Sequence, residues 1–209
     1  PNCAGFANFV DGIFAFAFLV EERERGGNIG MISQSGQIVL GGLDSPNMGF
    51  SHVISSGNSC NVKVEDYLDF LVDDEDTKVV AAYMEGVTKP EKLVAAFQKA
   101  ALKKKPVVVL KTGRSAKSQE LAKSHTGSLS GADKVLRAVF KRYGVVEAGD
   151  LEELMSLAAA FSWLEELPKG ERCVFMNVSG GEAGVMADLS EEYGIQLAEM
   201  QQETKAYLK

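Results

Sequence analysis

From residue 28 to residue 167, short apolar runs alternate with longer segments whose apolar residues recur at helical spacing. The run at residues 106–110 (PVVVL) is apolar throughout, as in strands that are buried on both faces of a parallel sheet. Alternating strands and helices predict a doubly wound α/β domain. Strands are predicted at residues 28–33, 50–55, 79–84, 106–110 and 145–146, and helices at residues 36–43, 65–72, 90–101, 132–142 and 151–164.

Two further segments flank this domain. Residues 168–209 begin within a linker-like LPKG sequence at residues 167–170. They contain a predicted strand at 173–178, a helix opened by glycines and a second strand at 195–197. A single β-α-β start does not close a sheet by itself, so we interpret this segment as the truncated start of a second flavodoxin-like α/β domain. Residues 1–27 are interpreted as the tail of an upstream domain and a linker. We therefore expect the chain to be a fragment of a longer protein.

Charge and composition exclude several classes of protein. A net charge of −7 argues against a general nucleic-acid binder, whose lysines and arginines would neutralise phosphates. No apolar run approaches the roughly 20 residues of a membrane helix, and the N-terminus lacks a secretory pattern. Cys3, Cys60 and Cys173 have no disulfide or metal spacing, and with two histidines we expect no metal site. A cytoplasmic protein with reduced thiols is the expectation.

The most informative motif is the loop at residues 111–131, KTGRSAKSQELAKSHTGSLSG, which leaves the carboxyl end of the fourth predicted strand. Open α/β sheets bind ligands at that edge. Between Lys111 and His125 the loop has four cations and one carboxylate, and His125 is flanked by serine, threonine and glycine. A neutral imidazole in such a loop can attack phosphorus. The alternative is a basic, solvated loop in which the histidine has no catalytic role.

A second motif is the turn Ser33-Gln34-Ser35-Gly36-Gln37, between the first predicted strand and its helix. Small residues at a helix start expose unpaired backbone N–H groups, and the helix dipole adds roughly half a positive charge there. Such a turn can bind phosphate. It is equally typical of a serine that caps a helix.

A third motif is Glu85-Gly86, directly after the third predicted strand. If the strands are adjacent, the Glu85 carboxylate shares an edge with His125, where it can accept the Nδ1–H of the imidazole and leave Nε2 to attack. The alternative is a glutamate solvated at a strand end. His52 lies within a predicted strand and is interpreted as a structural histidine.

In their order along the chain, these motifs resemble the NDP-forming acyl-CoA synthetases. ISQSG follows the first predicted strand, Gly57-Asn58 the second, YMEG the third and GRS the fourth, and SHTGSLSG contains His125. The family includes the ADP-forming acetyl-CoA synthetases (acetate–CoA ligases) and, more distantly, the succinyl-CoA synthetase α subunit. The resemblance runs from residue 28 to about residue 200 and implies a succinyl-CoA-ligase-like flavodoxin domain at residues 28–167.

The resemblance implies roles for individual residues. His125 is expected to be phosphorylated during turnover, and Glu85 is expected to contact it. The helix after the SQSG turn is expected to point its N-terminus at the phosphohistidine. The phosphate-binding residues that the resemblance implies are Ser35, Gly36, Gln37, Arg114, Thr126 and Gly127.

The implied activity is that of an acid–CoA ligase, which interconverts acyl-CoA, ADP and phosphate with acid, CoA and ATP through an acyl phosphate and a phosphohistidine. CoA and ADP or ATP with Mg²⁺ are expected as cofactors, bound mainly by a CoA-binding domain and an ATP-grasp domain or β subunit outside this chain. Pro1-Asn2-Cys3 resembles the segment that closes the CoA-binding domain. The expected substrate is a small carboxylic acid or its acyl-CoA. The protein is expected to form an oligomer and to bind neither nucleic acid nor membrane. The chain alone is expected to be inactive.

The sequence leaves open which acid is used, whether the nucleotide is ADP or GDP, and whether the ATP-grasp domain is fused to this chain. Two other interpretations of the function also stay open. One is a non-catalytic, synthetase-like module that senses a ligand; an intact SHTG sequence with His125 argues against it. The other is a flavodoxin-like module that binds a mononucleotide or a partner, which leaves the basic loop unexplained.

Overall fold

The computed structural model describes residues 3–17, 26–45, 48–113 and 133–207. The chain divides into two compact units, Pro1–Leu164 and Glu165–Lys209. The predicted domain boundaries after residues 27 and 167 stay predictions. Within the described ranges, no helix has both the length and the apolar character that crossing a bilayer requires.

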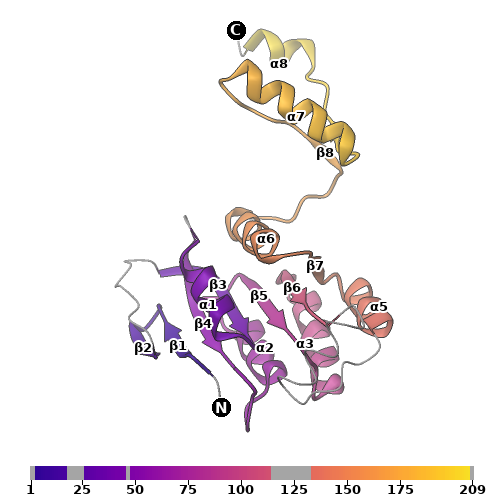
Figure 1. The fold of residues 1–209 in the computed structure, drawn as a ribbon. Coiled ribbons are helices and arrows are strands. Elements are labelled where there is room, and N and C mark those ends of the chain that lie inside the picture. Colours follow the sequence, from indigo (N-terminus) through magenta and orange to yellow (C-terminus); the bar gives the residue numbers. More distant parts are fainter. Residues whose placement is uncertain (1–2, 18–25, 46–47, 114–132, 208–209) are drawn as a thin grey trace. The chain divides into compact units, whose positions relative to one another are not determined.

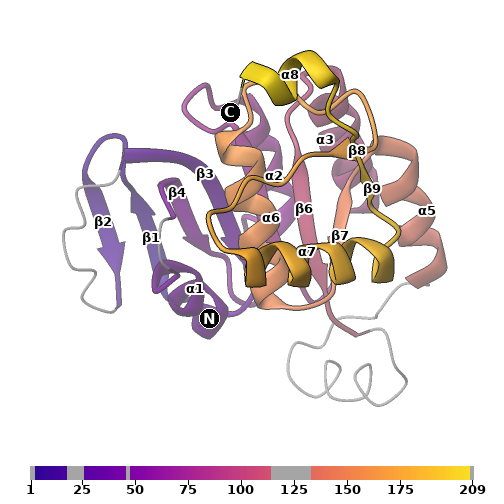
Figure 2. The ribbon, with the colours of Figure 1, turned by 90° about the horizontal axis from the view of Figure 1, so that it is seen from above.

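The first unit contains, in its described residues, a seven-stranded sheet with the order β2-β1-β4-β3-β5-β6-β7. The last five strands in this order are parallel to one another. Their order is that of a flavodoxin-like doubly wound sheet, as predicted, and Figure 2 shows the strands across the sheet from β2 to β7. The strands are β1 (Gly5–Asn8), β2 (Ile13–Phe16), β3 (Gly26–Ser33), β4 (Phe50–Ser55), β5 (Val79–Met84), β6 (Val107–Lys111) and β7 (Val146–Ala148).

Helices cover both faces of the parallel strands, with α6 on one side and α2 and α3 on the other (Figure 1). Successive strand residues point to opposite faces, so Met31 and Ala81 pack with α1 and α6, whereas Ile32 and Ala82 pack with α2, α3 and α5. Burial on both faces explains the uninterrupted apolar runs of β5 and of residues 107–110 in β6. The helices of this unit are α1 (Gly36–Leu43), α2 (Val64–Asp73), α3 (Pro90–Leu102), α5 (Asp133–Tyr143) and α6 (Leu151–Trp163).

The element boundaries follow the predictions closely. β4 and β5 begin and end at the predicted residues, and β6 begins one residue later than predicted. β3 begins two residues earlier, at Gly26. A Cβ atom on Gly27 would lie 1.9 Å from the carbonyl carbon of Gly49, so this start of the strand requires glycine at that position.

The hairpin of β1 and β2 was not predicted. β1 pairs antiparallel with both β2 and β4 and so extends the parallel sheet at its β4 edge. Gly5 has φ +106, and a Cβ atom there would lie 2.0 Å from the carbonyl oxygen of Ala15. This close approach of two backbones is a non-local contact, which a search for apolar runs does not detect.

The second unit contains a two-stranded parallel sheet of β8 (Arg172–Cys173) and β9 (Gln196–Leu197), with α7 (Gly180–Glu192) between them and α8 (Gln202–Tyr207) after them. The strand predicted at residues 173–178 is wrong in length, because only its first residue is in β8. Val174 and Met176 are 52% and 85% exposed, so no neighbouring strand covers the apolar run in the structure described.

Candidate functional site

The carboxyl ends of β3, β5 and β6 meet at one edge of the sheet. β3 pairs with β5 and β5 with β6, all in parallel, so Ser33, Met84 and Lys111 end adjacent strands. From β3 the chain connects to β4 on one side, and from β4 it crosses to β5 on the other side of β3. Doubly wound folds bind ligands at such a switch point. The turns at residues 34–36, 85–86 and 112–113 form the described part of the candidate site.

Gln34 connects two of these turns. Its side-chain oxygen accepts hydrogen bonds from the backbone N–H groups of Glu85 (2.5 Å) and Gly86 (3.1 Å). Its own backbone N–H donates to the carbonyl oxygen of Tyr83 (3.2 Å). The turn before α1 and the turn after β5 are therefore held in a fixed relation. Sequence reasoning singled out the turn but missed this role of Gln34.

Glu65 holds the other end of the segment that follows β5. Its carboxylate is fully buried and accepts hydrogen bonds from the backbone N–H groups of Thr88 (2.7 Å) and Lys89 (2.9 Å). Lys89 precedes α3 and makes no side-chain cap bond among the described residues, so a carboxylate from α2 satisfies the start of α3 instead. The sequence contained no signal for this contact beyond an acidic residue in the first turn of α2.

The Glu85 carboxylate lies beside a tyrosine. The hydroxyl of Tyr83 is 3.4 Å from Glu85 Oε1 and 3.2 Å from Thr112 Oγ1. Burial raises the pKa of Tyr83, and the neighbouring Glu85 charge raises it further, although the hydrogen bond with Thr112 opposes both effects. Tyr83 therefore stays protonated near neutral pH, and its hydroxyl can donate a hydrogen bond to the Glu85 carboxylate.

Among the cations of the loop at residues 111–131, Lys111 is the one that lies within the described residues. Its side chain is buried, and its ammonium donates to the carbonyl oxygens of Glu85 (2.9 Å) and Thr112. Gly113 follows with φ +81, a conformation that favours glycine. Lys111 thus connects the end of β6 to the turn after β5 and places a cation at the carboxyl edge.

The start of α1 is the predicted phosphate-binding element. Ser35 occupies the N-cap position, but among the described residues its side chain makes no capping hydrogen bond. The hydroxyl of Ser33 instead accepts from Ser35 N and donates to Ser35 O. Within the described part of the chain the start of α1 thus has no side-chain cap, whereas α6 is capped by Asp150 and α7 by Ser179. The alternative interpretation, in which the Ser35 side chain caps α1, is therefore not supported by the described contacts.

The predicted site residues divide into two groups. Glu85, Ser35, Gly36 and Gln37 are described, and they follow the adjacent strands β5 and β3 at the carboxyl edge. His125, Arg114, Thr126 and Gly127 lie outside the described residues, so their predicted roles remain predictions.

His52 agrees with its interpretation as a structural histidine. It is 7% exposed within β4, packs edge-on against Phe70 at 5.5 Å between ring centroids, and has its Nδ1 atom 3.5 Å from Asp74 Oδ2. Within the described ranges, no cluster of three histidine, cysteine or acidic side chains is arranged to hold a metal ion.

Comparison with known proteins agrees with this fold. The succinyl-CoA ligase like flavodoxin domain matches residues 26–161. The chain is 36% identical, over 98% of its length, to the α subunit of an ADP-forming acetate–CoA ligase II of Pyrococcus furiosus and covers 44% of it. It is 37% identical, over its whole length, to an ADP-forming acetate–CoA ligase of Methanocaldococcus jannaschii and covers 29% of that protein.

A solved structure is similar over nearly the whole chain. It is the dinucleotide forming acetyl-coenzyme A synthetase 1 of Ca. Korarchaeum cryptofilum in complex with phosphate and ADP, with a TM-score of 0.81 and 30% identity. The match covers 97% of this chain and 44% of that one, so the chain spans less than half the length of the relatives named here. The domain match and the flavodoxin-like strand order agree, and the chain belongs to the family of the succinyl-CoA ligase like flavodoxin domain, in which the relatives named here are ADP-forming CoA ligases.

Proposed function

We propose that this chain is the phosphoryl-carrying part of an NDP-forming acid–CoA ligase, with His125 as the residue that is phosphorylated. The observation that carries the proposal is the convergence, at one sheet edge, of the Glu85 turn, the start of α1 and the end of β6 from which the SHTG loop departs. This edge combines a carboxylate, a cation and a helix N-terminus. These are the groups that phosphoryl transfer to a histidine requires.

The reaction has three steps in the direction of ATP formation. Phosphate displaces CoA from an acyl-CoA and forms an acyl phosphate. The Nε2 atom of His125 then attacks phosphorus, the bond between phosphorus and the acyl oxygen breaks, and the carboxylic acid leaves. Finally the phosphoryl group passes from His125 to ADP, which regenerates the neutral imidazole. Each transfer depends mainly on positioning and on stabilisation of negative charge.

Glu85 is proposed to orient His125 by accepting its Nδ1–H, which leaves Nε2 as the nucleophile. Gln34 and Glu65 support this role because they hold the two ends of the segment 85–89, which begins with Glu85. The backbone N–H groups at Ser35, Gly36 and Gln37 are proposed to bind the phosphoryl oxygens, aided by the α1 dipole. The residues outside the described ranges that are proposed to join them are Arg114, Thr126 and Gly127.

The remaining components are proposed to reside on partners. ADP or ATP with Mg²⁺ is assigned to an ATP-grasp domain or β subunit, as the resemblance to the NDP-forming acyl-CoA synthetases implies. CoA is assigned to a CoA-binding domain. When bound, magnesium would neutralise charge on the nucleotide phosphates. The substrate is a small carboxylic acid or its acyl-CoA, and the active form is proposed to be an oligomer in the cytoplasm.

The test is phosphorylation of the chain by labelled ATP and magnesium, with an ATP-grasp partner of the same family. Wild type should acquire one acid-labile, alkali-stable label, and His125→Ala should acquire none. Because His52 is the second histidine of the chain, mapping the labelled peptide distinguishes the two. A label of this kind that persists in His125→Ala would contradict the proposal and favour a non-catalytic module.

A further inference from the structure

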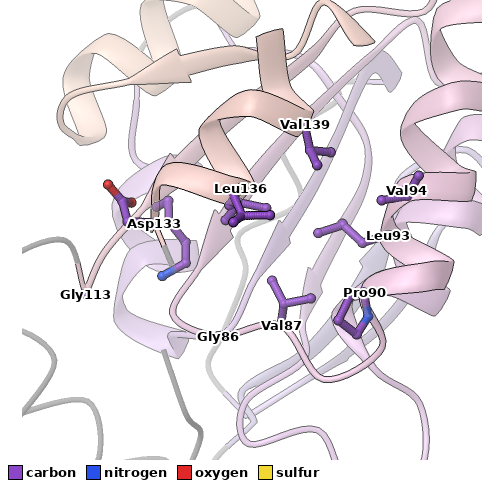
Figure 3. A pocket seen from close by; sticks show the side chains of 11 residues that line it. Gly86, Val87, Pro90, Leu93, Val94, Gly113, Asp133, Leu136 and Val139 are labelled. Atoms are coloured by element: carbon purple, nitrogen blue, oxygen red, sulfur yellow. The ribbon is translucent and has the colours of Figure 1, made fainter. Parts of the chain in front are cut away.

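A cavity of about 250 Å³ lies beside the Glu85 turn, between α3 and α5. Figure 3 shows its apolar wall, in which Val87, Leu93, Leu136 and Val139 point toward a common space. The cavity far exceeds the ~10–15 Å³ that one water molecule needs. An apolar space of this kind, with few polar groups, is typical of a small-molecule site.

The polar groups of the cavity lie at the carboxyl edge of the sheet. Gly86 and Lys111 line it, so the cavity reaches the residue next to Glu85 and the buried ammonium at the end of β6. Asp133 also lines the cavity, but its carboxylate pairs with Arg137 Nε at 3.0 Å and points away from the apolar side chains (Figure 3). An anionic group at this edge would therefore meet a cation, and an attached hydrocarbon group would meet the apolar wall.

We propose that this cavity binds the hydrocarbon part of the carboxylic acid substrate and selects acids larger than acetate. This inference rests on the proposed function, because it assumes that the reaction at the Glu85 edge uses a carboxylic acid. A methyl group fills little of the cavity, whereas a branched or aryl group contacts both α3 and α5. Each additional buried methylene stabilises binding by about 0.8 kcal/mol, close to a fourfold gain in affinity.

The probe is phenylacetate, added to the 209-residue chain with ¹³C-labelled valine and leucine methyl groups. The methyl resonances of Val87, Leu93, Leu136 and Val139 should shift and saturate, with a Kd on the order of 1 mM. Acetate at the same concentrations should give no saturating shift. Benzylamine, which has the ring but the opposite charge, should bind at least about tenfold more weakly because Lys111 lies at the polar end.

Two variants separate the cavity from other surfaces. Val94→Phe, on the α3 side, should fill the cavity and weaken phenylacetate binding at least about tenfold. Leu102→Phe makes a similar change at the exposed end of the same helix and should bind as wild type. If Val94→Phe does not fold, the comparison of phenylacetate with acetate and benzylamine in wild type decides the question.

Three results would overturn the inference: no saturable shift with phenylacetate, equal binding of benzylamine, or unchanged binding by a folded Val94→Phe chain. The titration needs neither ATP nor His125. Its failure would therefore contradict substrate binding in the cavity without bearing on the phosphorylation of His125. A missing label on His125, with phenylacetate still bound in the cavity, counts against the proposed function alone.

Discussion

The side-chain oxygen of Gln34 lies 2.5 Å from the backbone nitrogen of Glu85 and accepts its N–H. One amide thereby joins the turn before α1 to the turn that contains the proposed orienting carboxylate. The same oxygen accepts the N–H of Gly86, so loss of this side chain would leave two partly buried donors without their acceptor. Substitution of Gln34 is therefore the most direct test of whether the turn before α1 positions the turn that contains Glu85.

Gln34→Met should slow phosphorylation of His125 and lower the free energy of unfolding by about 1–3 kcal/mol, because two backbone donors lose their acceptor. Gln34→Glu keeps an acceptor oxygen and should retain most of the stability. Labelling rates and urea unfolding curves measure the two effects. Gln98→Met, at an exposed position of α3, is the matched control. Labelling by Gln34→Met at the wild-type rate would show that Glu85 does not depend on this contact.

Glu85→Gln should lower the rate of His125 labelling by roughly ten- to a hundredfold, by analogy with metal-bound histidines that lose the carboxylate that orients them. A neutral amide still fills the position, so the fold and phosphate binding should persist. Rapid-quench labelling measures the rate, and circular dichroism checks the fold. An unchanged rate would dismiss the proposed orienting role.

Glu65→Leu should lower the free energy of unfolding by about 2–5 kcal/mol, because the N–H groups of Thr88 and Lys89 lose a buried acceptor. Glu65→Gln retains one oxygen in nearly the same place and should lose less. Urea unfolding gives both values. Glu75→Leu, at an exposed loop position, should change stability by less than about 0.5 kcal/mol. A small loss in Glu65→Leu would mean that α3 begins without this carboxylate.

Acid should weaken the contact between α2 and α3. Hydrogen bonds from Lys92, the backbone of Lys63 and Lys89 hold the pKa of Asp66 well below its ordinary value of 3.8. A lowered folded-state pKa adds stability that is present above the unfolded pKa and is lost as pH falls toward the folded value.

The unfolding free energy of Asp66→Asn should therefore fall below that of wild type at pH 7, and the difference should shrink as pH falls below 3.8. Urea midpoints at several pH values measure this difference. A gap between the two proteins that stays constant down to the acid limit would show that Asp66 does not act through its charge.

Much of the parallel domain could be predicted from the sequence. β5 is apolar throughout, β4 is buried at every position, and α3 repeats its apolar residues at helical spacing after Pro90, so local patterning predicted their kind and their limits closely. The prediction of a strand at residues 173–178 was wrong in length, because an apolar run forms a strand only where a neighbouring strand pairs with it.

The sequence by itself determined the succession of strands and helices, the motifs after each strand and the family resemblance, because these depend on residues that are neighbours in the chain. Only the tertiary structure decided that β3 lies between β4 and β5, that Gln34 reaches the Glu85 turn, and that Glu65 caps α3 from another helix. The cavity between α3 and α5 likewise follows only from the tertiary structure. Such contacts join residues far apart in the chain, and they form only when the sheet brings the strand ends together.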